Sequence, residues 1–337
     1  MYSFRTPRFG GLRPEEALDE RFELEEVLEE ARRAKWSGRV HFYAPSFLPS
    51  ESRRLGVRSA FPSISVTGRW CALNCEHCAG RLLEGMEPAT TPDKLYEKSL
   101  KVWEVGGAGV LISGGCLPDG SVPLDRFIPA IERVKRELGL TVVVHTGLVK
   151  EEVAEGLAKA NVDAALLDIV GDEETARRVC HVEASLRDYE KSMERLRRHG
   201  VPFAPHVLVG LHYGELRGEL RALEAIARHG PSAVIVIALI PLPGTSMEKL
   251  RPPPPGTIAR VVAAARLMMP EVPLALGCAR PKGLHRVELD RLALRAGVDA
   301  VAFPTQAGFD EASKLGLSHS IHPTCCSQVY RDLGGPG

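Results

Sequence analysis

The sequence predicts an α/β fold of the (β/α)8 TIM-type barrel class, with a helical N-terminal extension and a C-terminal tail. From residue 62 onwards, short apolar, β-branched runs alternate with stretches of helical periodicity. Glycine, proline, aspartate or cysteine follows most of the runs, as is typical of strand-to-helix turns. The eight runs cover residues 63–67, 109–113, 141–145, 164–169, 203–209, 233–240, 273–276 and 300–303.

The segments between the runs and the two ends of the chain complete this organisation. Helical spacing of apolar residues occurs at 91–103, 124–138, 150–159, 185–199, 214–228, 255–269 and 286–296. Ahead of the barrel, residues 15–35 predict a charged amphipathic helix and residues 36–48 a strand with a loop. We therefore divide the chain into an extension (1–60), one barrel (61–310) and a tail (311–337) that closes over the barrel mouth.

Length, composition and charge indicate a cytoplasmic enzyme. The chain has 337 residues, a formal net charge of +0 and a pI of about 7.2, so neither nucleic acid nor an anionic membrane is expected as a partner. No apolar run in the sequence is long enough to span a bilayer, and its first residues lack the apolar segment of a signal peptide. Eight cysteines without a secretion signal favour metal ligands over disulfides.

Three cysteines of a CxxxCxxC motif, Cys71, Cys75 and Cys78, follow the first predicted strand of the barrel. This spacing allows one short loop to place three thiolates on one face of a [4Fe–4S] cluster. The fourth iron then has no protein ligand, and an open coordination position is typical of a catalytic metal site. A zinc knuckle is the alternative, but zinc sites usually add a matched second pair of cysteines, which this sequence lacks.

Polar and cysteine side chains follow several other predicted strands. Because catalytic residues of such barrels lie at the C-terminal ends of the strands, we expect these side chains around one rim. Each of them also fits ordinary turn chemistry. The candidates are Gly114, Gly115, Cys116, His145, Asp168, the segment 210–215, Pro241 and Cys278, and His206 and His212 are further pocket candidates.

The CxxxCxxC motif after a first strand resembles the signature of radical S-adenosylmethionine (SAM) enzymes. The resemblance implies that the amino and carboxylate groups of SAM bind the open iron of the cluster. It also implies that an electron from the cluster, supplied by a donor such as ferredoxin, cleaves SAM to a 5′-deoxyadenosyl radical. His77 occupies a position that is often aromatic in this motif, where its ring would shield the cluster.

The same resemblance predicts SAM contacts outside the cysteine loop. Gly114 and Gly115 stand where the family has a glycine-rich turn that receives the SAM amino group, although Cys116 replaces the acidic residue that usually follows. Arg187 stands where biotin synthase-like enzymes place an arginine near the SAM carboxylate, and a helix salt bridge is the alternative. The other predicted contacts are Asp168, the segment 210–215, Ile240 and Pro241.

Five cysteines lie outside the signature, and four of them suggest a second cluster. Cys180 lies in a helical stretch and fits core packing. Cys116 and Cys278 follow predicted strands, and the tail cysteines Cys325 and Cys326 would fold back over the same opening. We expect an auxiliary [4Fe–4S] cluster on the first two and on one or both of the tail cysteines. Packing or a tail disulfide is the alternative.

From about residue 40 onwards the chain resembles the biotin synthase-like group of radical SAM enzymes, in part through the segment 42–47. By analogy with the arginine ligand of biotin synthase, Arg280 is a candidate ligand of the auxiliary cluster. A second cluster facing the radical centre implies a sulfurtransferase, in which a cluster sulfide captures the carbon radical of the substrate. The motif context with Gly-Gly-Cys116 looks most like the C8-sulfurating member of the two-protein, archaeal-type lipoyl synthase.

The lipoyl synthase resemblance implies particular partners. The substrate would be an octanoyl-lysine on a lipoyl carrier, either an H protein or an acyltransferase lipoyl domain, and a second lipoyl synthase protein would add sulfur at C6. Two other classes stay open. A single-cluster radical SAM enzyme, such as a mutase, a methylase or a biotin synthase-like enzyme with another substrate, would leave Cys116 and Cys278 as packing. A non-enzymatic metal or scaffold protein would not cleave SAM.

Overall fold

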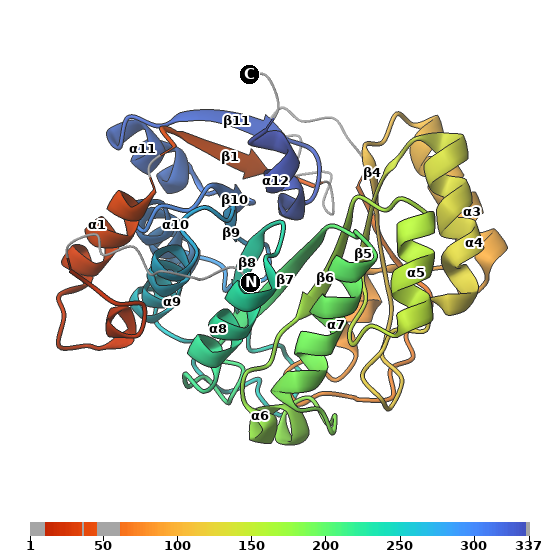
Figure 1. The fold of residues 1–337 in the computed structure, drawn as a ribbon, viewed down its shortest axis with the longest axis horizontal. Coiled ribbons are helices and arrows are strands. Elements are labelled where there is room, and N and C mark those ends of the chain that lie inside the picture. Colours follow the sequence, from red (N-terminus) through yellow and green to blue (C-terminus); the bar gives the residue numbers. More distant parts are fainter. Residues whose placement is uncertain (1–10, 36, 46–60, 335–337) are drawn as a thin grey trace.

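The computed structural model describes residues 11–35, 37–45 and 61–334 (Figure 1). Within these ranges, all strands belong to one parallel sheet in the order β11-β1-β10-β9-β8-β7-β6-β5-β4-β2-β3. The strands are β1 (Arg39–Tyr43), β2 (Ser63–Ser65), β3 (Glu87–Pro88), β4 (Gly109–Ser113), β5 (Thr141–His145), β6 (Ala164–Asp168), β7 (Phe203–Val209), β8 (Val234–Ala238), β9 (Leu274–Leu276), β10 (Ala300–Ala302) and β11 (Ser318–His322).

Helices follow most of the strands and cover the outer face of the sheet (Figure 1). The α-helices are α1 (Leu24–Ala34), α3 (Pro92–Glu104), α4 (Ile128–Arg133), α5 (Glu151–Lys159), α6 (Glu173–Arg178), α7 (Leu186–Arg198), α8 (Glu219–His229), α9 (Pro255–Met268), α10 (Leu284–Arg295), α11 (Gln306–Lys314) and α12 (Val329–Asp332). Shorter turns of helix are η1 (Glu16–Leu18), η2 (Arg81–Gly85), η3 (Asp125–Phe127), η4 (Val134–Leu138) and η5 (Cys326–Gln328). Among the described residues, no helix has the length and apolar content needed to cross a bilayer.

The predicted α/β barrel fold is confirmed. All eight predicted runs contain a strand, β2 and β4 to β10, because their apolar residues are buried on both faces of a parallel sheet. The described strands do not close the ring, since the order ends at β11 on one side and at β3 on the other. β3 has two residues, and Pro88 has no backbone N–H to donate to a further strand.

The two ends of the described chain join the same sheet. β1, which lies inside the predicted segment 36–48, pairs with β10 and with β11. β11 was not predicted, because its sequence Ser-His-Ser-Ile-His is polar and partly exposed on both faces. Residues from the extension, the barrel and the tail of the predicted division therefore share one sheet. Positions 36 and 46–60, which include the end of the segment 42–47, lie outside the described residues.

The C-terminal tail packs inside the barrel. Cys326 and Val329 are buried in a cluster with strand residues that face the interior, including Val143 and Leu166. The Tyr330 hydroxyl donates a hydrogen bond to the carbonyl of Asp163, the residue directly before β6. Because Asp163 precedes the strand, the tail extends from Cys326 to the N-terminal end of the barrel.

A buried ion pair joins the helix layer to the sheet at α9. The side chains of Arg266 and Asp299 are 0% and 3% exposed and form a salt bridge. The guanidinium also donates to the carbonyls of Gly297, Pro270 and Val272, and the carboxylate accepts the N–H of Leu274. The pair therefore satisfies backbone groups between α9, β9 and β10 that would otherwise be buried without partners.

Replacing Arg266 by methionine should destabilise the fold by about 3–5 kcal/mol, because Asp299 keeps a buried charge without its partner. Urea unfolding followed by circular dichroism measures the change. Lys98→Met is a matched control, since the Lys98–Glu87 pair is partly exposed and its loss should cost about 1 kcal/mol or less. An Arg266→Met protein that unfolds at the wild-type urea concentration would contradict the assignment.

Candidate metal centre

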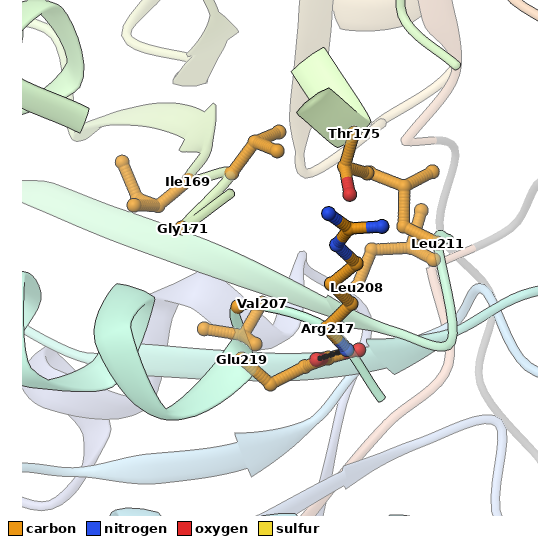
Figure 2. Close-up of a pocket in the computed structure, with 10 residues that line it drawn as sticks. Ile169, Gly171, Thr175, Val207, Leu208, Leu211, Arg217 and Glu219 are labelled. Carbon is orange, nitrogen blue, oxygen red and sulfur yellow. Dashed lines mark hydrogen bonds between the residues drawn. The ribbon is translucent and has the colours of Figure 1, made fainter. Parts of the chain in front are cut away.

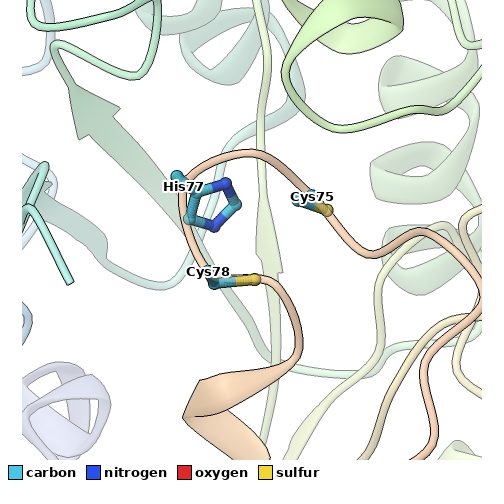
Figure 3. Close-up of side chains that lie close together, drawn as sticks. All are labelled: Cys75, His77 and Cys78. Atoms are coloured by element: carbon cyan, nitrogen blue, oxygen red, sulfur yellow. The ribbon is translucent and has the colours of Figure 1, made fainter. Parts of the chain in front are cut away.

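The cysteine motif forms a compact loop between β2 and η2. Ligand atoms of Cys75, His77 and Cys78 all lie within 4.8 Å of one another (Figure 3). Cys75 is buried, and Cys71 and Cys78 are half-buried. The Nδ1 atom of His77 is also buried and has no hydrogen-bond partner among the described residues.

Backbone hydrogen bonds fix the shape of this loop. The carbonyl of Cys75 accepts the N–H groups of Cys78 at 3.1 Å and of Ala79 at 2.7 Å. Asn74 and Ala79 adopt positive φ angles of 44° and 45°, which turn the chain sharply on either side of these bonds. The N–H of Glu76 donates to the carbonyl of Val179 at 2.8 Å, so the loop is also tied to the segment that follows α6.

The turn after β4 packs directly against the loop. A Cβ atom at Gly115 would lie 2.0 Å from the carbonyl oxygen of Trp70 and 2.6 Å from Cα of Cys71, so no larger residue fits there. The N–H of Gly115 donates to Oγ1 of Thr67 at 2.7 Å. The carbonyl of Cys116 accepts the N–H of Ala72 at 2.8 Å. The glycine turn therefore determines where Cys71 lies.

Two thiols of the motif, those of Cys75 and Cys78, have raised pKa values. A hydrogen bond with the side chain of Cys180 raises the pKa of the Cys75 thiol well above its usual range, and Sγ of Cys75 also lies 3.3 Å from the carbonyl of Cys180. A hydrogen bond with Cys75, together with burial, raises the pKa of Cys78 to about 12. Soft sulfur donors of this kind suit iron–sulfur clusters. The cysteine donor set and the unpaired His77 nitrogen fit such a cluster, whose binding would release the thiol protons.

Cys116 belongs to this first group of cysteines. Burial raises the pKa of its thiol to about 12, and Cys71, Asp168 and Cys78 add to the effect through their charges. The carbonyl of Cys116 accepts the N–H of Ala72, so Cys116 lies beside the CxxxCxxC loop. We had expected Cys116 to join Cys278 and the tail cysteines instead.

The other three auxiliary candidates form a separate group. Burial by the surrounding protein and the neighbouring Cys325 raise the pKa of the Cys278 thiol, although this residue is exposed at the surface. A hydrogen bond with Cys326 lowers the pKa of Cys325, and the pKa of Cys326 is raised by the same bond, by burial and by nearby Cys278. The structure therefore brings together Cys278 after β9 and the two cysteines of the tail.

Two predicted arginines have other partners. Arg280 is buried and forms a salt bridge with Asp290, and its guanidinium donates to the carbonyls of Gly277 and Phe303. These contacts occupy both terminal nitrogens, yet the guanidinium acts electrostatically on Cys278 and Cys326, and ligation of a cluster by Arg280 stays a prediction. Arg187 lies on the exposed side of α7, where it pairs with Glu194. The pair matches the salt-bridge alternative, and a SAM contact by Arg187 stays a prediction.

A second group of donor atoms comes from the ends of β5 and β6 and from the middle of β7. Ligand atoms of His145, Asp168 and His206 are within 4.8 Å of one another, and Nε2 of His145 lies 3.8 Å from Oδ2 of Asp168. Burial lowers the pKa of His206 to about 4, so its ring is neutral at physiological pH. The structure therefore brings together three of the predicted rim residues. His212 lies apart from this group, because its Nδ1 forms a hydrogen bond with Thr175.

Glu219 is a positioning residue that sequence reasoning missed. Its buried carboxylate accepts the N–H of Gly210 at 2.8 Å and that of Arg217 at 2.6 Å, and burial raises its pKa. Figure 2 shows Glu219 and Arg217 among the residues that line a small pocket between β6, β7 and the start of α8. Glu219 thus holds the segment 210–215 at the strand end. An acidic residue in the first turn of a helix after a glycine-rich segment is the signal that indicates it.

The remaining predicted contacts follow β8 at the same end of the sheet. Ile240 and Pro241 follow the strand after one intervening residue and are both half-buried. Like Gly114, Gly115 and Asp168, they lie where the predicted site requires, and their contact with SAM stays a prediction.

The comparisons with known proteins agree with this geometry. Residues 65–223 match the model of the radical SAM superfamily. Biotin synthase of Halorhodospira halophila is 28% identical over 256 residues, which cover 73% of this chain and 76% of that protein. Biotin synthase of Synechococcus sp. strain CC9605 is also 28% identical, over 253 residues, with 71% of this chain and 73% of that protein covered.

Two solved structures share the fold. Methylornithine synthase superposes with a TM-score of 0.62 at 15% identity, covering 95% of this chain and 99% of that one. The FeFe-hydrogenase maturase HydG from Carboxydothermus hydrogenoformans superposes with a TM-score of 0.63 at 17% identity, covering 94% and 76%. Residues 65–223 therefore match a radical SAM domain, whose family implies a [4Fe–4S] cluster and SAM, and the chain is similar to biotin synthases over 73% of its length.

Proposed function

We propose that this radical SAM enzyme inserts sulfur into an unactivated C–H bond and is the C8-sulfurating component of a two-protein lipoyl synthase. The observation that carries the sulfur-insertion part is the group formed by Cys278, Cys325 and Cys326, separate from the CxxxCxxC loop. The homology to biotin synthases supports the same chemistry. The choice of an octanoyl-lysine substrate rests on the resemblance of the sequence to the lipoyl synthase pair.

The residues of this chain would hold and separate two clusters. Cys71, Cys75 and Cys78 would hold the first cluster, and Gly115 allows the β4 turn to approach Cys71 closely enough to fix it. Cys278 and the tail cysteines would hold the auxiliary one. When bound, the first cluster with SAM supplies a 5′-deoxyadenosyl radical, and the auxiliary cluster supplies sulfide. Tail residues that fill the barrel interior exclude water from beneath this pair of sites.

Partners and location belong to the same proposal. The substrate would be an octanoylated carrier, either an H protein or an acyltransferase lipoyl domain. A second lipoyl synthase protein would complete the product, and a donor such as ferredoxin would supply electrons in the cytoplasm.

The position of Cys116 favours a second candidate function. Because Cys116 lies with the first group, at most three cysteines remain for an auxiliary cluster, and Arg280 is engaged by Asp290. A radical SAM enzyme with one cluster, such as a mutase or a methylase, would leave those three cysteines as interior packing.

Iron and acid-labile sulfide per chain distinguish the two candidates. After anaerobic reconstitution, two clusters should give about eight irons, which fall to about four in a Cys71/Cys75/Cys78→Ala variant and also in a Cys278/Cys325/Cys326→Ala variant. Cys180→Ala is a matched control that should keep all the iron, because Cys180 contacts Cys75 but belongs neither to the CxxxCxxC motif nor to the Cys278 group.

If the Cys278/Cys325/Cys326→Ala variant keeps the wild-type iron content, sulfur insertion from an auxiliary cluster is excluded. If it loses about four irons, its cleavage of SAM under dithionite should persist while sulfur transfer to an octanoylated H protein stops. Mass spectrometry of the carrier peptide measures that transfer directly.

Gly115→Ala should impair loading of the first cluster, because the added Cβ collides with the backbone of Trp70 and Cys71. We expect the variant to lose about four irons per chain, as the triple cysteine variant does. Gly85→Ala is the control, since a Cβ at that position meets nothing within 4 Å. Wild-type iron content in Gly115→Ala would show that the loop relaxes without losing its ligands.

A further inference from the structure

We propose that His145, Asp168 and His206 form a binding site for a divalent transition-metal ion, distinct from the cysteine clusters. The ligand class is an ion that accepts two imidazole nitrogens and one carboxylate oxygen, as zinc(II) does. The proposal goes beyond sulfur insertion and does not depend on it.

The strand register places the three side chains on one face. Asp168 in β6 is the direct Cα partner of His206 in β7, and His145 in β5 pairs with Leu166. Leu166 packs in the cluster inside the barrel. Because side chains two residues apart on a strand share a face, Asp168 lies on the same inward face as Leu166. The three residues therefore share one layer of the interior near the C-terminal rim, where β5 and β6 end and β7 continues.

Hydrogen bonding prepares the donor atoms for a cation. Nδ1 of His206 lies 3.1 Å from the carbonyl of Ala204. A carbonyl only accepts, so Nδ1 carries the proton and Nε2 keeps its lone pair, as in many metal-binding histidines. Oδ1 of Asp168 is buried and has no hydrogen-bond partner among the described residues. A cation would satisfy this oxygen.

The spacing of the donor atoms matches a metal site that closes slightly on binding. Zinc binds nitrogen and carboxylate oxygen at about 2.0–2.2 Å, which places neighbouring ligand atoms about 3–3.5 Å apart. The separation of 3.8 Å between Nε2 of His145 and Oδ2 of Asp168 needs a small rotation of either side chain. With three protein ligands, the ion would keep an open position for a water molecule or a substrate oxygen.

The residues around the proposed ion indicate what its open coordination position would bind. Asp168 acts electrostatically on Cys116 and His77, so the site lies beside the first cysteine group. An ion there would hold an oxygen-bearing group of a substrate at the barrel mouth. The competing role for Asp168 is the SAM contact predicted from the sequence.

Zinc binding to the reconstituted holoenzyme tests the proposal without an activity assay. Chelator-washed protein is titrated with zinc(II), and bound zinc is measured by elemental analysis and by X-ray absorption at the zinc edge, which iron does not obscure. We expect one zinc per chain with nitrogen and oxygen neighbours at about 2.0–2.2 Å and no sulfur at about 2.3 Å. His206→Gln, His145→Gln and Asp168→Asn should each weaken zinc binding at least tenfold.

The controls separate a lost ligand from a damaged fold. Each variant must keep the wild-type iron content and circular dichroism spectrum, and His199→Gln, a histidine paired with Glu151 on the outer surface, should bind zinc as wild type does. Three single variants are compared so that one that fails to fold does not decide the result. The proposal is overturned if wild-type protein retains no zinc, if the bound zinc has sulfur neighbours, or if the folded variants bind it unchanged. Asp168→Asn that weakens SAM binding but not zinc binding would assign Asp168 to SAM instead.

Discussion

The shared direction of the strands is the constraint on which every candidate site depends. Since all the described strand pairs are parallel, their C-terminal ends lie along one rim, and residues far apart in the sequence meet there. Cys71, Cys116, Asp168 and Cys278 follow or end four different strands. Backbone ladder bonds therefore do most of the positioning, and the loops add local adjustments such as the close approach of Gly115 to Cys71.

Much of the fold could be predicted, because parallel strands buried on both faces leave a strong apolar signal. The runs at 109–113, 141–145 and 203–209 coincide with β4, β5 and β7 in both bounds. β11 carries no such signal, since an edge strand exposed on both faces needs no apolar residues. The interior position of the tail also escaped prediction, because Tyr330 and Arg331 find their partner Asp163 across more than 160 residues of sequence.

The candidate site was predictable where the signal is local and obscure where it depends on three-dimensional neighbours. The spacing of Cys71, Cys75 and Cys78 was enough to predict that one short loop carries all three. Whether Cys116 lies with these three cysteines depends on the turn after β4, which packs against their loop through a glycine. Arg187 and Arg280 illustrate the opposite case: each stands at a suggestive position, yet a carboxylate on a neighbouring turn or helix binds it. Glu219 was not predicted as a site residue, because the sequence does not show which backbone N–H groups a carboxylate binds.

The tail that fills the barrel interior has a consequence for how the protein is made. A ribosome delivers the strands β1 to β10 before residues 325–333, so the nascent barrel has its walls before it has Cys326 and Val329 to fill its centre. The cysteine loop of residues 71–78 leaves the ribosome much earlier. The hollow intermediate exposes apolar strand faces until translation is nearly finished, which makes it a natural client for chaperones. Premature termination near residue 320 would leave this barrel permanently without its centre.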